Sequence, residues 1–399
     1  MAELRTPLPP EKSDLIALRR DFHRHPELGL QEFRTAQRIE EELDRLGISH
    51  IRVGETGVLG TLTGTKSGGG AVVLRADIDA LPLQETTGAA YASVTDEVMH
   101  ACGHDAHIAC LLGAARILAS RRDRFGGEVR FVFQPAEEVG QGAKSFVEAG
   151  VLKDAARVFG IHVASDLPAG TVGLKPGLNN AAVDHFILTI HGKSAHVSTP
   201  QLGVDALYIA SQTVVALQAL VTRLTAAVEP VIIGVGKLNA GTTYNALAEQ
   251  AVLEGTTRTL SQESRQRIHA LVDRTARNIA DIYGGTVETE WVDCAAPLIN
   301  NQQACTEAAA VAEPLFGAGH VITDHPLSLS GDNFAEFLLH TPGAYAYLGT
   351  GNPALPHTLS PGHNGNFDID EDTLLLGAEL YAGYAVSVLG GTAKAEKPD

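Results

Sequence analysis

Residues 99–107 read Met-His-Ala-Cys-Gly-His-Asp-Ala-His, so this short stretch holds a thiol, three imidazoles and a carboxylate. In an extended or tightly turned backbone, residues i and i+2 point to the same side, so Cys102 and His104 can face one ion. Thiolate and imidazole are ligands of zinc and its first-row neighbours. The alternative is that the histidines and the aspartate cap a helix formed by the apolar run 108–118. The rest of the chain decides between the two.

Length and charge indicate an acidic protein of two domains. The chain has 399 residues, and a single core seldom grows beyond about 250–300 residues. Its 30 basic and 47 acidic residues give a net charge of −17, which argues against nucleic acid or an anionic membrane as partner. There is no signal-peptide pattern at residues 1–10, and no apolar run long enough to span a membrane. Four irregularly spaced cysteines suit free thiols, so we expect a cytoplasmic protein.

Three apolar, strand-like runs in the first half of the chain are followed by ionisable residues. They are 71–76 with Asp77 and Asp79, 129–133 with Glu137 and Glu138, and 157–161 with His162. Helical patterns lie between the runs, and this alternation predicts a largely parallel sheet covered by helices. Because ligands bind beyond the carboxyl ends of such strands, we expect these side chains to converge near residues 99–107.

The pattern changes near residue 183. Strand-like runs and two long amphipathic helices follow in the order β-α-β-β-α-β, which predicts a four-stranded antiparallel sheet with both helices on one face. We interpret residues 184–297 as an α+β lid domain inserted into a catalytic domain of residues 1–183 and 298–399. The α/β pattern then resumes, and a loop before the last helix contains His357 and His363.

The candidate ligands are too many for one tetrahedral ion. They are Cys102, His104, Glu138, His162 and one of the two C-terminal histidines. Such a set suits two ions that share a bridging carboxylate or water. Glu137 lies beside Glu138 but points away from it, so it can act as a general base toward a water molecule. The alternative for this acidic pair is a solvated helix start. The combination predicts metal-assisted hydrolysis of an acyl derivative.

Motifs along most of the chain resemble the di-metal amidohydrolases related to hippurate hydrolase, N-acyl-amino-acid amidohydrolase and indole-acetyl-amino-acid hydrolase, within the aminoacylase/carboxypeptidase superfamily. The motifs lie at residues 24–29, 74–82, 99–107, 133–138, 191–196 and 255–258. The resemblance implies a phosphorylase/hydrolase-like catalytic domain with a mostly parallel central sheet. It also implies that the inserted domain is a lid through which copies of the chain form a homodimer or a dimer-based homo-oligomer.

Site roles follow from the same resemblance. The implied metal ligands are Cys102, His104, Glu138, His162 and His363. Glu137 is the implied proton acceptor, and Asp79 steadies a metal-site ligand. The implied cofactors are two divalent ions per subunit: zinc, manganese, nickel or cobalt. His196, Asn245 and Arg258 of the lid are implied to bind the substrate; without the resemblance, His196 reads as a turn residue and Arg258 as a surface charge.

Three segments depart from the family pattern, one of them in the lid, where the usual Pro-His is Pro200-Gln201. Counting back from Phe367 favours His363 over His357 as the ligand, although His363 is followed by Asn-Gly where the family has Ser/Asn-Pro. The family's Ser-Glu-Asp-Phe is Gly-Asp-Asn-Phe at residues 331–334, so Asn333 replaces an acid.

The implied activity is hydrolysis of a linear amide. It would convert N-acyl amino acids, with an acetyl, benzoyl or similar group, to a carboxylate and a free amino acid. One alternative is a metallo-carboxypeptidase or dipeptidase with the same site. Another is a non-catalytic small-molecule binder, which the complete set of ligands disfavours.

Overall fold

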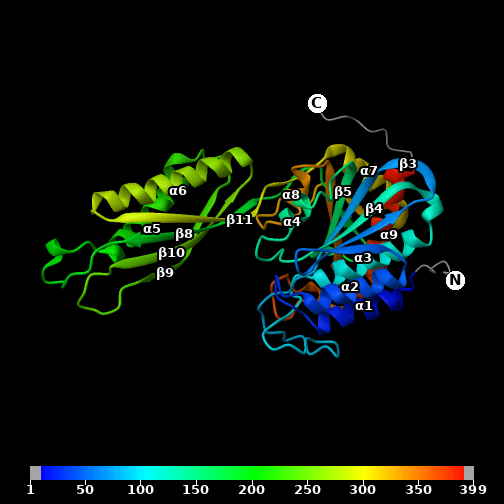
Figure 1. The fold of residues 1–399 in the computed structure, drawn as a ribbon, viewed down its shortest axis with the longest axis horizontal. Coiled ribbons are helices and arrows are strands. Elements are labelled where there is room, and N and C mark those ends of the chain that lie inside the picture. The colour runs from blue at the N-terminus through cyan, green and yellow to red at the C-terminus, as the bar shows by residue number, and fades with distance from the viewer. Residues whose placement is uncertain (1–9, 391–399) are drawn as a thin grey trace. The chain divides into compact units, whose positions relative to one another are not determined.

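A computed structural model of the chain describes residues 10–390, and these residues group into two compact units. The first comprises the described parts of Met1–Asn179, Ile299–Pro326 and Asn333–Asp399, and the second comprises Asn180–Leu298 and Leu327–Asp332 (Figure 1). The second unit thus holds the segment interpreted as an inserted domain, and it also takes in a short segment from later in the chain. A two-stranded sheet of β7 (Gly177–Asn180) and β12 (Leu298–Asn300) lies where the chain passes between the units.

An eight-stranded sheet with the order β1-β2-β4-β3-β5-β14-β6-β13 forms the centre of the first unit. Its strands are β1 (Ser49–Val53), β2 (Gly57–Thr63), β3 (Lys66–Asp77), β4 (Gly126–Gln134), β5 (Ala155–Pro168), β6 (Val172–Gly173), β13 (Val321–Ile322) and β14 (Gly343–Gly351). The pairs β4–β3, β3–β5 and β5–β14 are parallel, whereas β1–β2, β2–β4 and β14–β6 are antiparallel. The predicted mostly parallel central sheet is therefore confirmed, with antiparallel strands toward its edges.

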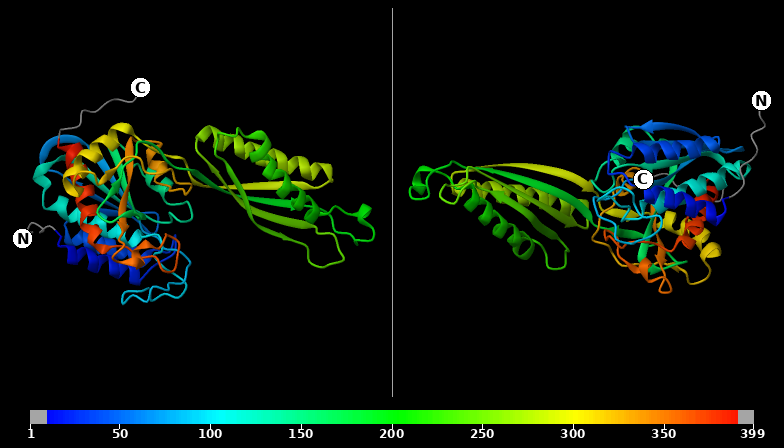
Figure 2. Two further views of the ribbon diagram at one scale, coloured as in Figure 1. Left: turned by 180° about the vertical axis from the view of Figure 1, so that it is seen from behind. Right: turned by 90° about the horizontal axis from the view of Figure 1, so that it is seen from below.

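Helices cover both faces of this sheet (Figure 2). They are α1 (Lys12–Arg24), α2 (Phe33–Arg45), α3 (His104–Ala119), α4 (Ala143–Glu148), α7 (Gln302–Phe316), α8 (Ala335–Leu338) and α9 (Leu374–Leu389), with short 3-10 turns at Arg122–Arg124, Pro356–Leu359 and Glu371–Thr373. Neighbouring residues of β5 show the two faces, because successive side chains of a strand point to opposite sides. Phe159 packs against Tyr381 and Tyr384 of α9, whereas a Cβ on Gly160 would meet Phe334, just before α8.

The second unit contains a four-stranded antiparallel sheet with the order β11-β8-β10-β9, and two helices. Its elements are β8 (Ala182–His191), a 3-10 turn at Pro200–Leu202, α5 (Ala206–Leu224), β9 (Ile232–Ala240), β10 (Gln250–Thr259), α6 (Gln262–Ile282) and β11 (Thr286–Ala295). Burial alternates along β8, and its inward-facing Phe186, Leu188 and Ile190 join residues of both helices in one core. The predicted α+β arrangement is confirmed.

Helix α5 begins after Asp205, whose carboxylate accepts hydrogen bonds from the backbone N–H groups of Leu207 and Tyr208. By length and composition it is the one helix of the described residues that could cross a membrane. Its buried residues, which include Ile209 and Leu217, belong to the core of the second unit. Only the side of the helix that faces the sheet is buried, and 28% of its apolar window lies inside the unit.

Candidate active site

The cysteine–histidine motif forms the sharp turn that leads into α3. Gly103 precedes the helix with φ +85°, and a Cβ at this position would collide with Val163. Glycine is therefore required both for the left-handed backbone and for the close approach to β5. The turn places Cys102 and His104 on either side of Gly103, and helix α3 starts at His104.

The structure corrects the predicted position of His162. The sequence places this residue after a strand that ends at residue 161, but β5 continues to Pro168. The predicted convergence still holds, because the pairing of β3 with β5 ends at Arg75 and Gly160. His162 therefore lies inside β5 but beyond the end of its ladder with β3. The apolar residues after His162 prolong the strand, since Val163 and Ala164 are buried as well.

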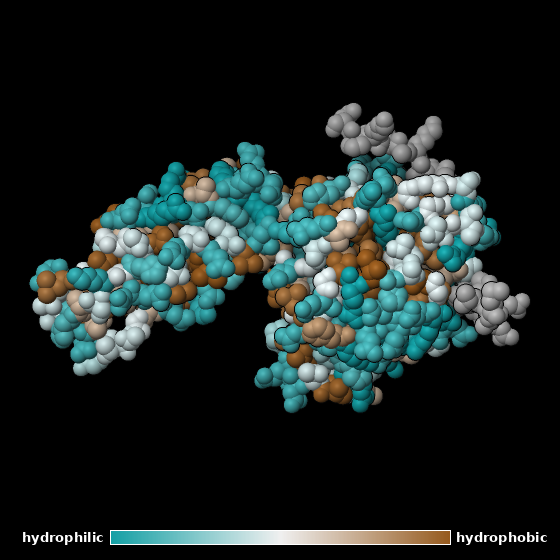
Figure 3. All heavy atoms as spheres, in the orientation of Figure 1, coloured by the Kyte–Doolittle hydropathy of each residue, from teal (hydrophilic) through white to brown (hydrophobic). Residues whose placement is uncertain are grey.

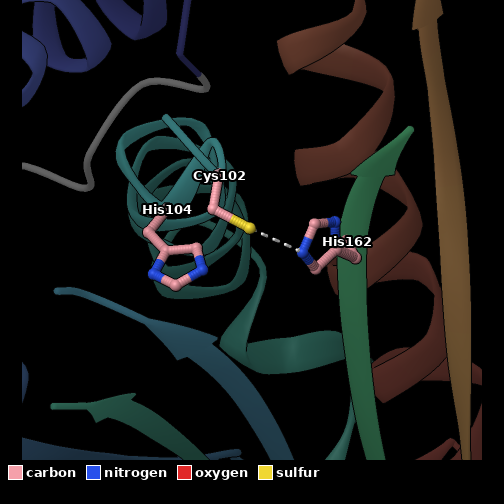
Figure 4. A group of neighbouring side chains, drawn as sticks. All are labelled: Cys102, His104 and His162. Carbon is pink, nitrogen blue, oxygen red and sulfur yellow. Dashed lines mark hydrogen bonds between the residues drawn. The ribbon is translucent and has the colours of Figure 1, made fainter. Parts of the chain in front are cut away.

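Cys102, His104 and His162 form a compact group (Figure 4). Cys102 Sγ lies 3.4 Å from His162 Nε2. The other ring nitrogens define the tautomers, because a carbonyl oxygen can only accept a hydrogen bond. His104 Nδ1 donates to Asp79 O over 2.9 Å, and His162 Nδ1 donates to Val163 O over 2.7 Å. In both rings Nε2 is thus the nitrogen with a lone pair available for a metal ion.

Glu138 and His363 complete this group. Glu138 Oε2 lies 3.4 Å from His363 Nε2, and Glu138 Oε1 lies 3.8 Å from His104 Nε2. The backbone of His363 has φ +59°, and its N–H donates to Ala101 O over 2.8 Å. The other histidine candidate, His357, lies 3.9 Å from Asp368 and is in none of the candidate metal groups of the described residues.

The donor atoms fit divalent cations. Three of the four candidate groups of the described residues are Cys102–His104–His162, Cys102–Glu138–His363 and His104–Glu137–Glu138, and within each group the donor atoms lie within 4.8 Å of one another. Among the described residues, His104 Nε2 and Glu138 Oε1 are buried without a hydrogen-bond partner. Burial, reinforced by the charge of Glu138, raises the pKa of the Cys102 thiol far above its usual range. A cation would supply the missing partners and keep this sulfur as a thiolate.

Asp79 connects two members of the group. Its Oδ2 accepts the backbone N–H of Glu138 over 2.9 Å, and its Oδ1 lies 3.3 Å from His104 Nδ1. The side chain is buried. Asp79 therefore fixes the backbone of Glu138, from which its side chain extends, and the orientation of the His104 ring.

Asp77 and His107 are buried next to His104, and the sequence analysis had not assigned them a role. Together with His104 they are close enough to hold a metal. However, His107 Nδ1 donates to Asp77 Oδ1 over 2.5 Å, and its Nε2 accepts the Val163 N–H over 2.9 Å. Since both ring nitrogens are engaged, His107 supports β5 beside His162 instead of acting as a ligand. The detectable signal was its position one helical turn after His104 in the motif.

The loop that carries Glu137 and Glu138 is held by residues that the sequence analysis also missed. Ala136 adopts φ +56°, and its N–H donates to Glu32 Oε1 over 2.8 Å. Glu137 Oε1 accepts the backbone N–H of Asn333 over 3.2 Å. Glu32 and Asn333 are buried. Glu32 stands in no pattern that reveals its contact, and Asn333 was noticeable only as a departure from the family pattern.

The predicted substrate-binding residues lie in the second unit. His196 forms an isolated bridge with Ala246, and the Val197 N–H donates to Asn245 O over 3.2 Å, so His196 and Asn245 belong to neighbouring loop segments. His196 Nδ1 accepts from Ser198, and both His196 and Asn245 leave side-chain surface accessible. Arg258 is on β10, where its guanidinium bonds to Thr256 and Thr257.

Comparisons with known proteins agree with this site. Residues 73–387 match the model of peptidase family M20/M25/M40. An N-acetylcysteine deacetylase of Bacillus subtilis is 37% identical over 94% of this chain and 97% of its own length. Thermostable carboxypeptidase 2 of Saccharolobus solfataricus is 37% identical over 93% of this chain and 94% of its own length.

A solved structure from Bacillus subtilis, described as a dinuclear metal-binding peptidase of the M20 family, superimposes with a TM-score of 0.79 at 35% identity. The match covers 95% of this chain and 98% of that protein. The family predicted from the motifs is therefore confirmed. This chain belongs to peptidase family M20/M25/M40, and it is a hydrolase that acts on amide bonds.

Proposed function

We propose that this protein hydrolyses the amide bond of N-acyl amino acids with the help of two divalent ions. The observation that carries the proposal is the convergence of donor atoms from four separate segments, with Glu138 common to two of the candidate groups. Cys102, His104 and His162 would hold one side of the centre, and Glu138 and His363 the other. A shared carboxylate between two ligand sets suits a two-ion site. The thiolate of Cys102 favours zinc, nickel or cobalt, and manganese is a further candidate.

Glu137 is the proposed proton acceptor. It is next to Glu138 in the chain, and the Asn333 N–H holds one of its carboxylate oxygens. Bound ions would polarise the scissile carbonyl and lower the pKa of a water molecule from about 15.7 toward about 7. Glu137 would remove a proton from the attacking water and then transfer it to the nitrogen of the leaving amino acid. Asp79 keeps Glu138 and His104 in place during both transfers.

The substitution Glu137→Gln tests this assignment. Glutamine keeps the size of the side chain but cannot accept the proton, so turnover of acetyl- or benzoyl-amino acids should fall by about 10²–10⁴-fold. Metal analysis should still find the same ion content as in the wild type. Glu148→Gln, a change of the same kind at an exposed position of α4, is the matched control. Turnover retained by Glu137→Gln would refute the proposal.

A carboxypeptidase or dipeptidase activity is the second candidate. It is favoured by the identity to the Saccharolobus carboxypeptidase, which equals that to the deacetylase. Both activities need the same ions and the same proton acceptor, so the site alone does not separate them. Values of kcat/KM measured side by side on hippurate-type substrates and on dipeptides would separate the two activities. We expect the N-acyl amino acids to be preferred.

The second unit is the proposed lid and dimerisation domain. Its His196 and Asn245 would donate hydrogen bonds toward the scissile carbonyl, and Arg258 would bind the substrate carboxylate. Helix α5 exposes apolar residues on the side away from the core, among them Tyr208 (47% exposed) and Val215 (68% exposed). Hydrophobic residues also reach the surface among hydrophilic ones in Figure 3. A second copy of the chain would cover this apolar surface and form a homodimer.

The four cysteines are all free thiols. Because Cys102 must remain reduced to bind a metal, a reducing compartment suits the proposed activity, and we expect the enzyme to act in the cytoplasm.

A further inference from the structure

Asn333 connects the proposed proton acceptor to the centre of the sheet. The residue is 4% exposed. Its backbone N–H donates to Glu137 Oε1 over 3.2 Å. Its side-chain oxygen accepts from Arg75 Nη2 over 3.1 Å and from Gln134 Nε2 over 2.8 Å. Its side-chain nitrogen donates to Gln141 O over 2.8 Å.

The partners of this side chain are themselves fixed. Arg75, on β3, donates to Asp77 Oδ2 over 2.7 Å and to Gln134 Oε1 over 3.0 Å. Gln134 is the last residue of β4, and its side-chain nitrogen also donates to Gln141 O over 3.3 Å. Asn333 is thus attached to two neighbouring parallel strands on one side and to the loop that contains Glu137 on the other.

A neutral amide is required at this position. The side chain must accept from Arg75 and Gln134 and at the same time donate to a carbonyl oxygen. A carboxylate would turn an acceptor toward Gln141 O and remove the shorter of the two hydrogen bonds to that carbonyl, leaving only the 3.3 Å bond from Gln134 Nε2. It would also add a second negative charge beside the Arg75–Asp77 pair. The asparagine therefore matches a hydrogen-bonding pattern that an aspartate in its ionised form does not.

We propose that Asn333 is a positioning residue for Glu137. Its side-chain amide locks the peptide N–H that holds the Glu137 carboxylate, so that this carboxylate stays oriented for proton transfer. The proposal rests on the proposed role of Glu137. It predicts that changes at Asn333 lower kcat without a comparable change in substrate binding or metal content, because the hydrogen bonds of its side chain go to Arg75, Gln134 and Gln141 and not to the proposed metal ligands.

The test compares Asn333→Ala and Asn333→Asp with a matched control, Asn300→Ala. Asn300 is 2% exposed, and its side chain also makes three hydrogen bonds, to Lys175 O, Tyr345 O and Tyr345 N. A displacement of a reacting group by 1 Å can cost about 10²-fold, so we expect kcat to fall by about 10–100-fold in both Asn333 variants. KM should change less than about threefold, metal content should be unchanged, and Asn300→Ala should keep kcat within about threefold.

Two further measurements separate a positioning role from general damage. Hydrogen exchange in the peptide that spans residues 135–142 should become faster in Asn333→Ala and remain unchanged in Asn300→Ala. In a Glu137→Gln background, Asn333→Ala should cause no further loss, because residues that act as a unit are not additive. The side chain in Asn333→Asp has nearly the size of the native one, so this variant replaces Asn333→Ala in the test if the alanine variant does not fold.

Wild-type kcat in an Asn333 variant would overturn this inference, as would an equal loss in Asn300→Ala or a full additional loss in the Glu137→Gln background. Retained turnover in Glu137→Gln alone would instead refute the proposed function, so the two failures are distinguishable.

Discussion

Glu32 offers a direct test of how the proposed catalytic loop, which carries Ala136, Glu137 and Glu138, is held. Its buried carboxylate, at the start of α2, accepts the N–H of Ala136 over 2.8 Å. Ala136 has φ +56°, a conformation that costs a non-glycine residue about 1–2 kcal/mol. Glu137 and Glu138 follow directly. The substitution Glu32→Ala therefore removes the contact that keeps a strained backbone in place just before the two glutamates.

The size of the effect follows from these contacts. A hydrogen bond to a charged group contributes about 1.5–3 kcal/mol, which is of the same order as the strain that it offsets. Without it, the loop is expected to relax and to move the two glutamates, and a shift of about 1 Å costs about 10²-fold in rate. We therefore expect kcat/KM to fall about 100-fold. The free energy of unfolding should fall by about 2–3 kcal/mol, which for a unit of this size corresponds to roughly 4–6 °C in Tm.

The assay measures kcat/KM on an acetyl-amino acid together with the unfolding midpoint and the metal content. Glu27→Ala is the matched control, because the Glu27 carboxylate accepts two backbone N–H groups, from Arg34 over 3.0 Å and Thr35 over 2.8 Å. These contacts stabilise the first turn of α2 and do not touch the catalytic loop. Glu27→Ala should lose stability but keep its activity within about threefold. Wild-type activity in Glu32→Ala, or an equal activity loss in Glu27→Ala, would refute the reasoning.

Two further predictions concern the second unit. Burial raises the pKa of Asp184, but hydrogen bonds from Arg265 and His269 outweigh burial, so the pKa of this carboxyl is lowered on folding. The ionised Asp184 therefore stabilises the fold above pH of about 3.9, and this stabilisation is lost as pH falls through the folded-state pKa. Asp184→Asn should lower the free energy of unfolding by about 3–5 kcal/mol at pH 7, and urea titrations should show the difference shrinking at acid pH. For the proposed dimer, Val215→Asp should raise the dimer dissociation constant at least about tenfold in sedimentation experiments, whereas Ile282→Asp, on α6, should not. A monomeric wild type would contradict the dimer.

The sequence was sufficient for the parts of the site that local patterns determine. Apolar runs located β3, β4 and β5, and the rule for parallel strands then placed Asp79 and Glu138 on one edge. Cys102 and His104 were recognisable because no helix or strand needs that combination of side chains. Strand direction also grouped Glu138 and His162 with them, whereas His363 lies in a loop and was identified only through the family resemblance.

The contacts that support the loop could not be predicted in this way. Glu32 and Ala136 are 104 residues apart, and Asn333 and Glu137 are 196 residues apart. Glu32 has the residue type expected at any helix start, and Asn333 the type expected in any loop. Their roles depend on tertiary packing. The predicted end of β5 was also wrong. The residues after His162 are buried and prolong β5, although the pairing of β5 with β3 ends earlier.

The geometry of this loop also explains why two adjacent glutamates can have different tasks. Asp79 holds the backbone N–H of Glu138 and Glu32 holds that of Ala136, so the backbone between them cannot rotate to exchange the two carboxylates. Asn333 then fixes the carboxylate of Glu137. In each of the three contacts a carboxylate, that of Asp79, Glu32 or Glu137, accepts from a backbone N–H, and such carboxylates repel one another strongly where water is excluded. Cations bound at the Glu138 side would relieve that repulsion, so the residues that set the geometry of the proposed proton acceptor would also create the electrostatic requirement for metal ions.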